Sequence, residues 1–353
     1  MEQLSHRKLR TGWTTGACAT AAAKAAFSAL LTGRFPDPVS ILLPGGERPE
    51  FPLAVQELAG DTARAGVVKD AGDDPDVTHG ALVIVQVRRL EEGRGVVFRA
   101  GEGVGTVTLP GLPVPVGEPA INPAPRRMIS EVLREVAGAH GAACDVEVEI
   151  SIPGGEKLAR RTMNPRLGIV GGLSVLGVSG IVRPYSCSAW IAAIREGVDV
   201  ARALGLEHLA GSTGRLSERA VRARYGLPEQ ALIDMGDFAG GLLKYVRRHP
   251  VPRLTIAGGF AKLAKLARGA MDLHSSRSSM DFDWLAELAG LKDVARANTA
   301  MQALDMARSA GVDLAGAVAR HALERIGEVL DGAPVRADVL VVDREGRVIA
   351  DAA

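Results

Sequence analysis

The second half of the chain alternates short apolar runs with longer segments in which apolar residues recur every three or four positions. The short runs indicate buried strands, and the longer spacing indicates helices with one apolar face, such as one over 188–204. Regular alternation of strand and helix is typical of a parallel sheet covered by helices on both faces. We therefore predict an α/β, Rossmann-like domain with a mostly parallel sheet over residues 166–353. Its strands are expected at 167–170, 207–210, 231–234 and 253–257, followed by two or three helices and a hairpin at 339–343 and 348–350.

The first half has a different pattern. An alanine-rich segment predicts a helix over about 15–31, and Asn122-Pro123 suits the N-cap and first residue of a second helix that reaches about residue 139. Elsewhere, short β-prone segments are separated by Gly, Pro and Asp in the manner of turns. Residues 1–165 are therefore expected to form an α+β domain. Its strands are predicted at 39–43, 51–55, 62–68, 81–87, 96–99, 106–109, 145–152 and 157–163.

The segments that follow the predicted strands of the second domain are rich in glycine. In open α/β sheets, the loops at the carboxyl ends of the strands form one rim where ligands bind, and glycine lets a ligand approach the main chain closely. The spacing does not match GxGxxG, so the dinucleotide fingerprint is not met. We expect a cofactor at this rim; a purely structural turn is the alternative for the loop 171–180 taken alone. The residues assigned to cofactor binding are Gly171, Gly172, Gly177, Gly180, Gly211, Ser212, Thr213, Gly214, Gly258 and Gly259.

The start of the alanine-rich helix is a candidate anion site. Thr14 or Thr15 can cap the helix, and its first turn is expected to offer free N–H groups and the positive end of the helix dipole. An ordinary capped and buried helix explains the same sequence. Cys18 is expected to be a small packed residue rather than a nucleophile. The candidate substrate-binding residues here are Thr14, Thr15, Gly16 and Cys18.

Residues 69–80, KDAGDDPDVTHG, place several carboxylates and one imidazole in a single predicted loop. Such a group can bind a hard cation or transfer protons, and the alternative is a solvated turn in which Asp side chains cap backbone N–H groups. The EF-hand pattern is not met, because the glycine and the final glutamate are misplaced. We favour acid–base work or ligand orientation over a metal site. The candidate catalytic residues are Asp73, Asp74 and His79.

Composition narrows the classes of partner. The chain has 42 Lys and Arg against 41 Asp and Glu and only 4% aromatic residues, so it lacks both the basic footprint and the stacking platform of nucleic-acid-binding proteins. Three cysteines without CxxC spacing indicate a reducing compartment and no structural zinc. The sequence has no run of eighteen apolar residues and no hydrophobic signal core. We expect a cytoplasmic protein without nucleic-acid or membrane partners; a homo-oligomer is compatible with the sequence.

Five long stretches of unusual composition stand out. They are LRTGWTTGACATAAAKAA, VVKDAGDDPDVTHGA, GEPAINPAPRRMI, GLSVLGVSGIVRPYS and GGFAKLAKLARGAMDLHSSRSSMD. Together they resemble the cobalt-precorrin-5B C(1)-methyltransferase family, CbiD, over most of the chain. The resemblance implies transfer of a methyl group from S-adenosylmethionine to ring carbon C-1 of cobalt-precorrin-5B, giving cobalt-precorrin-6A, in anaerobic cobalamin biosynthesis. S-adenosylmethionine is then the co-substrate, and cobalt enters only as part of the tetrapyrrole substrate.

The residues are compatible with this chemistry. Holding a donor methyl group in line with a nucleophilic carbon can lower the activation barrier by about 7–11 kcal/mol by positioning alone. Such an enzyme needs no catalytic nucleophile, and the sequence has no GxSxG, HExxH or Walker A motif. A macrocycle fringed with acetate and propionate groups requires cationic donors. The alternative for each cation is a solvated surface charge. The substrate-binding candidates are Arg126, Arg127, Arg183, Lys262 and Lys265, with Arg268 and Arg277 as further ones.

Two other classes fit parts of the sequence. A nucleotide-dependent oxidoreductase of the same pathway would use the same rim for NAD(P), but it needs an acidic residue or an arginine to hold the ribose, and residues 211–214 offer neither before Arg215. A non-catalytic tetrapyrrole-binding protein would bind the macrocycle without gaining stability from the methyl donor. The response of the melting temperature to each ligand separates the three classes.

Overall fold

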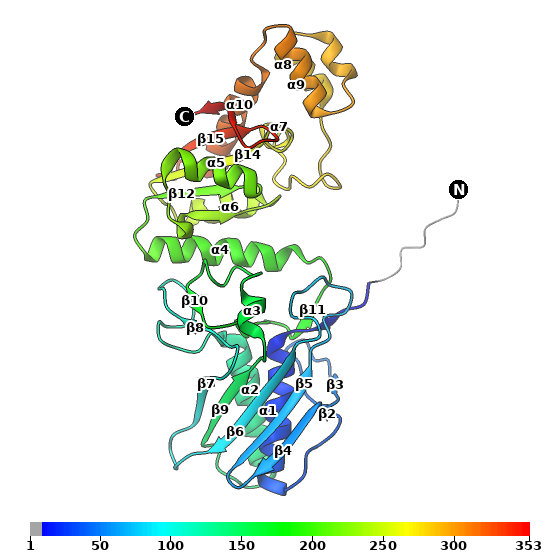
Figure 1. Cartoon of the computed structure of the whole chain (residues 1–353), viewed down its shortest axis with the longest axis vertical. Coiled ribbons are helices and arrows are strands. Elements are labelled where there is room, and N and C mark those ends of the chain that lie inside the picture. Colours follow the sequence, from blue (N-terminus) through cyan, green and yellow to red (C-terminus); the bar gives the residue numbers. More distant parts are fainter. Residues whose placement is uncertain (1–8) are drawn as a thin grey trace, which may run out of the picture. The chain divides into compact units, whose positions relative to one another are not determined.

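The computed structural model describes residues 9–353, and the chain folds into two compact units that divide between Ser186 and Cys187 (Figure 1). Unit 1 runs from blue to green in Figure 1, and unit 2 from green to red. Each unit combines helices with a mixed sheet, which confirms the mixed α/β class predicted from the sequence. Residues 166–186, assigned above to the second domain, belong to unit 1.

Unit 1 is built on a five-stranded sheet with the order β4-β5-β6-β9-β7. Neighbouring strands are antiparallel, except that β7 runs parallel to β9. Every second residue of β5, namely Ala63, Ala65 and Val67, is buried, so one face of the sheet packs on the core. The strands are β4 (Val55–Ala59), β5 (Thr62–Val68), β6 (Leu82–Arg89), β7 (Val96–Ala100) and β9 (Val146–Ser151).

Two helices, α1 (Thr15–Thr32) and α2 (Pro123–Ala139), cover this face (Figure 1). The alanines of α1 are fully buried, and their small side chains let the helix contact β5, β6 and α2 at once. The helix begins at Thr14, whose Oγ1 accepts the Ala17 N–H (3.2 Å), and ends at Gly33, where φ is 76°. Both predicted helices of the first half are confirmed.

Three short strand pairs complete unit 1. They are β1 (Gly12–Trp13) with β11 (Ile181–Val182), β8 (Thr106–Val107) with β10 (Ile169–Val170), and β2 (Val39–Ser40) with β3 (Glu50–Phe51). The prediction that 167–170 opens the sheet of the second domain is wrong, because this strand has two residues and pairs with β8 in unit 1. Gly168 and Gly171 flank it with φ of 71° and 89°, so the chain turns on both sides.

The strand predicted over 157–163 is also wrong. The segment contains α3 (Gly155–Ala159), which follows Gly154 at φ 75°, and then a series of turns. Backbone groups there bond locally; the N–H of Leu167, for example, donates to the carbonyl oxygen of Met163 (3.1 Å). Because these local bonds occupy the main chain, no sheet neighbour is required.

Unit 2 is built on a second five-stranded sheet, with the order β13-β12-β14-β15-β16. The first four strands are parallel, and β16 is antiparallel to β15. Three predicted strands and the closing hairpin are confirmed, and the first hairpin strand also joins the parallel sheet. The strands are β12 (His208–Ser212), β13 (Leu232–Asp234), β14 (Arg253–Gly259), β15 (Arg336–Val342) and β16 (Val348–Ala352).

Helices cover both faces of this sheet (Figure 1). Over one face, α5 (Arg215–Tyr225) packs Val221 against Ala210 and Leu340. Alternate strand residues such as Leu254 and Ile256 point to the other face and the larger core. The helices of that core are α4 (Cys187–Ala203), α6 (Ala239–Arg248), α7 (Phe260–Ala267), α8 (Phe282–Ala289), α9 (Ala300–Ser309) and α10 (Leu314–Leu330).

The strand order reverses at β12. The chain passes from β12 outward to β13 and then returns to the opposite side of β12 as β14. The loops that leave β12 and β14 therefore diverge, and such a reversal opens a crevice at the carboxyl ends of the strands.

The amino ends of the same strands carry a closed polar network. The carboxylate of Asp338, which is 2% exposed, accepts hydrogen bonds from Arg253 (2.8 Å), Thr255 (2.6 Å) and Tyr225 (3.1 Å). A ring nitrogen of His208 lies 2.8 Å from the Thr255 hydroxyl, and burial lowers the pKa of this histidine. Because these groups satisfy one another, the amino edge is a structural element, and the carboxyl edge is where a ligand can find open polar groups.

Candidate functional site

A pocket of about 460 Å³, here called the rim pocket, opens in unit 2 at the carboxyl ends of β12, β14 and β15. It lies at the point where the strand order reverses, which is where the topology predicts a ligand. Its volume is within the range of about 300–1,000 Å³ typical of small-molecule sites. The lining residues central to the site are Thr213, Gly214, Leu216, Gly259, Lys262 and Met301.

Two helices begin in the rim pocket. The N-cap residues are Gly214 for α5 and Gly259 for α7, so neither helix start is capped by its own side chain. Uncapped first-turn N–H groups and the positive ends of two helix dipoles favour anionic or hydrogen-bond-accepting ligands. The Lys262 Nζ adds a positive charge 2.8 Å from an Asp237 carboxylate oxygen and 3.3 Å from the carbonyl oxygen of Thr213.

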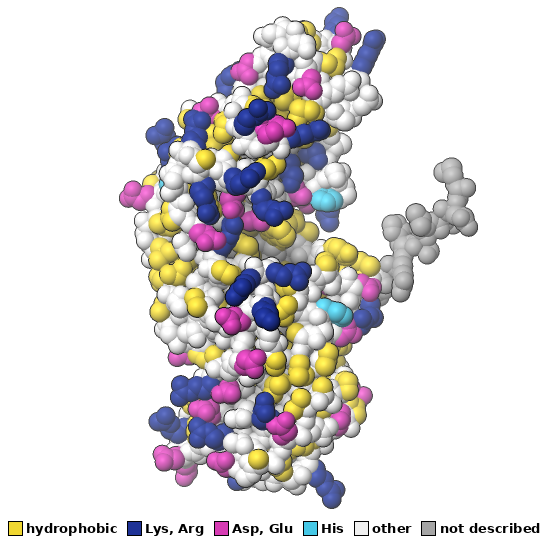
Figure 2. All heavy atoms as spheres, in the orientation of Figure 1, with side chains coloured by type: hydrophobic (Ala, Val, Ile, Leu, Met, Phe, Trp, Pro, Cys, Tyr) yellow, Lys and Arg dark blue, Asp and Glu magenta, His cyan; other side chains and the backbone are white. Residues whose placement is uncertain are grey.

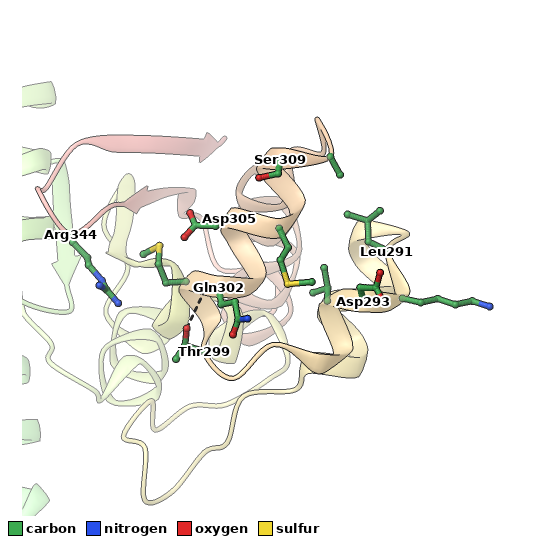
Figure 3. A pocket seen from close by; sticks show the side chains of 12 residues that line it. Leu291, Asp293, Thr299, Gln302, Asp305, Ser309 and Arg344 are labelled. Atoms are coloured by element: carbon green, nitrogen blue, oxygen red, sulfur yellow. Dashed lines mark hydrogen bonds between the residues drawn. The ribbon is translucent and has the colours of Figure 1, made fainter.

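A larger hollow of about 790 Å³ adjoins the rim pocket, between α9 and the short helix η2 (Lys292–Arg296) (Figure 3). The two share Thr299, Met301 and Arg344 in their linings. In Figure 3, Arg344 extends from the β15–β16 turn toward the start of α9, where the hydroxyl of Thr299 caps the Gln302 N–H (3.1 Å). A ligand in the rim pocket therefore has a route into a second, more polar space.

The residues predicted at the rim of unit 2 divide into two groups. Thr213, Gly214 and Gly259 line the rim pocket. Gly258 is buried behind Thr213, and a side chain at Gly211 would overlap Leu242 inside the core. Ser212 is fully buried as well. Gly211 and Gly258 therefore serve close packing beneath the pocket.

The glycines of 171–180 are not at this rim. They lie in unit 1, where a Cβ at Gly172 would overlap the main chain of Gly103 and a Cβ at Gly177 would overlap the side chain of Thr14. Gly180 packs in the same way against Leu43. The expectation that these glycines share one edge with 211–214 and 258–259 is wrong, because their strand belongs to the other unit.

The stretches that were singled out in the first half meet at one end of the unit 1 sheet. The main-chain N–H of Trp13 donates to the carbonyl oxygen of Asp70 (2.7 Å), and Trp13 also pairs with Ile181. The Asp73 carboxylate accepts the Arg10 N–H (2.7 Å), and the Asp74 carboxylate accepts the Tyr185 N–H (2.7 Å). This end of unit 1, made of residues 10–18, 69–80 and 173–185, is here called the assembled end.

The start of α1 is closed by the chain itself. The N–H of Gly16 donates to Leu176 (3.0 Å), the N–H of Thr14 donates to Gly180 (3.0 Å), and the Thr15 hydroxyl also bonds to Leu176. The expectation of free N–H groups for an anion at this helix start is therefore wrong. Burial raises the pKa of the Cys18 thiol to about 12, which makes Cys18 a packed residue, as expected.

The acidic loop mainly holds main chain in place. A bidentate pair with Arg10 keeps the pKa of Asp70 at about 2, and the His79 Nδ1 accepts the Ala71 N–H (3.1 Å). Tyr185, whose N–H is held by Asp74, has a φ of 57°, which is strained for a residue other than glycine. The structure thus brings Asp73, Asp74 and His79 together, and their catalytic role stays a prediction.

The glycines of the acidic loop provide a test of this assembly. Gly72 and Gly80 both have positive φ (68° and 75°), so alanine at either position costs about 1–2 kcal/mol of strain. A Cβ at Gly72 would also overlap the main chain of Arg10 and Thr11, whereas Gly80 faces open space. Gly72→Ala is therefore expected to lower the free energy of unfolding by about 3 kcal/mol or more in urea titrations, against about 1–2 for Gly80→Ala. Equal losses would contradict the close packing of Arg10 and Thr11 on the acidic loop.

The Arg and Lys side chains predicted to bind substrate also fall into two groups. The Arg126 guanidinium bonds to the carbonyl oxygens of Ile121 (2.9 Å) and Pro119 (3.0 Å), and the Lys265 Nζ bonds to the carbonyl oxygen of Leu273 (3.1 Å). These two side chains hold their own loops. Arg127 and Arg183 are exposed and have no ion-pair partner in the described part of the chain, so both remain open to a ligand.

Sequence reasoning missed Thr299, Met301 and Arg344 as pocket residues. Arg344 follows β15, and the rule that ligands bind beyond the carboxyl ends of parallel strands would have selected it. The sequence pattern of 339–343 predicts only half of a closing hairpin, which hides the parallel pairing of this strand with β14. Thr299 and Met301 carry no comparable sequence signal.

Charge on the molecule is mixed. Figure 2 shows Lys and Arg side chains interspersed with Asp and Glu side chains on the face that it draws, in line with the formal net charge of +1. Within residues 9–353, no helix is long and apolar enough to span a bilayer, and no group of three or more His, Cys, Asp or Glu residues is arranged to hold a metal ion. An anionic ligand would therefore depend on a few placed groups rather than on a general positive field.

A mixed α/β fold with a pocket at the switch point of a mainly parallel sheet is typical of small-molecule-binding proteins. The chain belongs to the CbiD family: the family model described as CbiD matches residues 2–184, and the model described as CbiD, C-terminal domain, matches residues 272–353. This confirms the resemblance found in the sequence.

Two relatives of high sequence identity agree with the family assignment. The cobalt-precorrin-5B C(1)-methyltransferase of Paramagnetospirillum magneticum is 62% identical over 98% of this chain and 98% of its own length. The protein of the same name from Brucella anthropi is 58% identical over 97% and 95%. A crystal structure of the cobalamin biosynthesis protein CbiD from Archaeoglobus fulgidus matches 86% of this chain and 85% of its own, with 26% identity and a TM-score of 0.41.

Proposed function

We propose that this chain transfers the methyl group of S-adenosylmethionine to C-1 of cobalt-precorrin-5B, giving cobalt-precorrin-6A in anaerobic cobalamin biosynthesis. The observation that carries the proposal is the 62% identity, over 98% of both chains, with a cobalt-precorrin-5B C(1)-methyltransferase. The match spans both units, so the proposal does not depend on one of them alone.

The methyl donor is assigned to the rim pocket, on an interpretation of unit 2 as Rossmann-like. S-adenosylmethionine supplies an electrophilic methyl group; a carbon–carbon bond forms as the carbon–sulfur bond breaks, and the electron pair stays on sulfur in S-adenosylhomocysteine. The N–H groups at the starts of α5 and α7 suit the ribose oxygens of the nucleoside, while Leu216 and Met301 supply apolar contacts. The chain fixes the direction of the methyl group. Such positioning can lower the activation barrier by about 7–11 kcal/mol.

The assembled end of unit 1 is assigned to the tetrapyrrole. Val178 and Tyr185 are 80% and 68% exposed there, and Arg183 lies between them in sequence with its guanidinium unpaired in the described chain. Apolar surface beside a free cation suits a macrocycle with a flat apolar body and carboxylate arms. Asp73 and Asp74 act on the substrate indirectly, by fixing the main chain of Arg10 and of Tyr185.

Ligand-dependent melting tests the proposal. S-adenosylhomocysteine at about 100 times its Kd should add about 2.7 kcal/mol to the free energy of unfolding and raise the melting temperature. NADH at the same concentration should have no effect. Stabilisation by NADH alone indicates an oxidoreductase, and stabilisation by neither ligand indicates a tetrapyrrole-binding protein without a donor site; either result contradicts the proposal.

A further inference from the structure

Arg344 occupies the junction of three hollows in unit 2. Besides the rim pocket and the larger hollow beside α9, a third hollow of about 460 Å³ lies along the start of β16. Met301 and Arg344 belong to all three linings. A side chain at such a junction contacts any ligand that extends from the rim pocket into either neighbour.

The guanidinium of Arg344 is unpaired, unlike most of the charged groups around it. Lys262 pairs with Asp237, Arg347 pairs with Asp343 (2.7 Å), and Arg308 lies 3.8 Å from Asp305. Arg344 is exposed and has no ion pair or hydrogen bond within residues 9–353. Arg215 and Lys292 are also unpaired there, but each lines only one of the hollows.

The turn that carries Arg344 is held in a fixed conformation. The Asp343 carboxylate accepts the N–H groups of Glu345 (3.0 Å) and Arg347 (2.8 Å), and Gly346 takes a φ of 84°. The main chain under Arg344 is therefore set before a ligand arrives, which reduces the entropy lost on binding. An arginine on a fixed turn presents a planar fork of N–H donors that matches a carboxylate.

We propose that Arg344 binds the carboxylate at the amino-acid end of the methyl donor, while the nucleoside end occupies the rim pocket between α5 and α7. This inference rests on the proposed function, because it names the group of the donor that the junction holds. The side arms of the tetrapyrrole carry the same chemical group, and the experiment separates the two sources.

The experiment measures binding to the full chain by titration calorimetry with two probes. S-adenosylhomocysteine has the amino-acid carboxylate, and 5′-methylthioadenosine keeps the nucleoside but lacks it. Arg344→Gln should raise the Kd for S-adenosylhomocysteine by about 10–100-fold, as expected for the loss of a charged hydrogen-bonded pair. The Kd for 5′-methylthioadenosine should stay unchanged. Arg320→Gln, which removes an exposed arginine of α10 that has no ion pair in the described chain and lines none of the three hollows, is the matched control and should leave both constants unchanged.

Each other result overturns the inference in a recognisable way. An equal rise in the Kd of both probes means that Arg344 shapes the pocket without binding the carboxylate. Unchanged binding of both probes means that Arg344 does not bind the donor, and weaker binding of a carboxylated tetrapyrrole in the same variant then assigns it to the substrate. If the unaltered chain binds neither probe, the donor site fails together with the inference, whereas failure in the Arg344 variant alone leaves the proposed function standing.

Discussion

Replacing Asp76 with asparagine is expected to lower the free energy of unfolding by about 3–5 kcal/mol, the cost of leaving a buried charge without its partner. The Lys69 side chain is 1% exposed, and its ammonium pairs with the Asp76 carboxylate. The same carboxylate accepts the N–H (2.7 Å) and the hydroxyl (2.6 Å) of Thr78. Asparagine keeps the shape of the side chain but removes the charge, so the ammonium of Lys69 stays buried and uncompensated.

Urea titrations of the Asp76→Asn variant at pH 7 measure this loss. The control is Glu57→Gln, which removes an exposed ion pair with Arg64 (2.8 Å) on the same sheet and should cost at most about 1 kcal/mol. Similar losses in the two variants would show that the Lys69–Asp76 pair does not stabilise unit 1 beyond an ordinary surface pair.

The effect of Asp76 should also depend on pH. Burial acts to raise the pKa of Asp76, but the charge of Lys69 and the hydrogen bonds outweigh it, and the net shift is downward. A carboxyl with a lower pKa in the folded than in the unfolded state stabilises the protein above its unfolded pKa of about 3.9. That stabilisation is lost as the pH falls through the folded pKa. The difference in free energy of unfolding between wild type and Asp76→Asn should therefore become smaller below about pH 4. A difference that stays constant with pH would contradict a stabilising role for the ionised Asp76 carboxylate.

Replacing Gly259 with aspartate is expected to weaken donor binding at least about 10-fold without destabilising the chain. Gly259 is the N-cap of α7, with φ −67° and ψ 151°, and a Cβ there meets no atom within 4 Å. Aspartate is a favourable N-cap and should change stability by only a few tenths of a kcal/mol, about the difference from glycine. Its carboxylate would bond to the first-turn N–H groups of α7 and place negative charge in the rim pocket.

The measurement is the Kd for S-adenosylhomocysteine, with the melting temperature recorded on the same samples. A tenfold change corresponds to about 1.4 kcal/mol, which the loss of one hydrogen bond to the donor can account for. Gly259→Ala is the control, because it adds only a methyl group in the same open space. Unchanged donor affinity in Gly259→Asp would contradict the assignment of the donor to the start of α7.

Much of the fold could be predicted because its signals are local. The N-cap Thr14, the C-cap Gly33 and the Asn122-Pro123 pair mark helix ends that the structure confirms. The pairing of β10 could not be read in this way. A two-residue strand carries no periodicity, and its partner β8 lies about sixty residues earlier in the chain, so only tertiary contacts decide where it belongs.

The candidate site was predicted less well, for a related reason. A glycine that admits a ligand and a glycine that admits another main chain look the same in a sequence. Gly259 faces open space in the rim pocket, whereas Gly177 lies against Thr14 and Gly211 against Leu242. Arg344 was missed because it is available to a ligand only through the absence of an ion-pair partner within the described chain. A sequence does not record which charged groups pair.

The assembled end of unit 1 has a consequence for the order in which the protein is made. Its hydrogen bonds join residues far apart in sequence: the main chain of Thr14 to that of Gly180, and the Asp74 carboxylate to the N–H of Tyr185. A nascent chain synthesised only through β9 already holds both helices and every strand of the first sheet. It still lacks β11, the partner of β1, and the amide that Asp74 binds. During synthesis on the ribosome, the scaffold can therefore form first, and this surface must wait until the last residues of unit 1 have emerged.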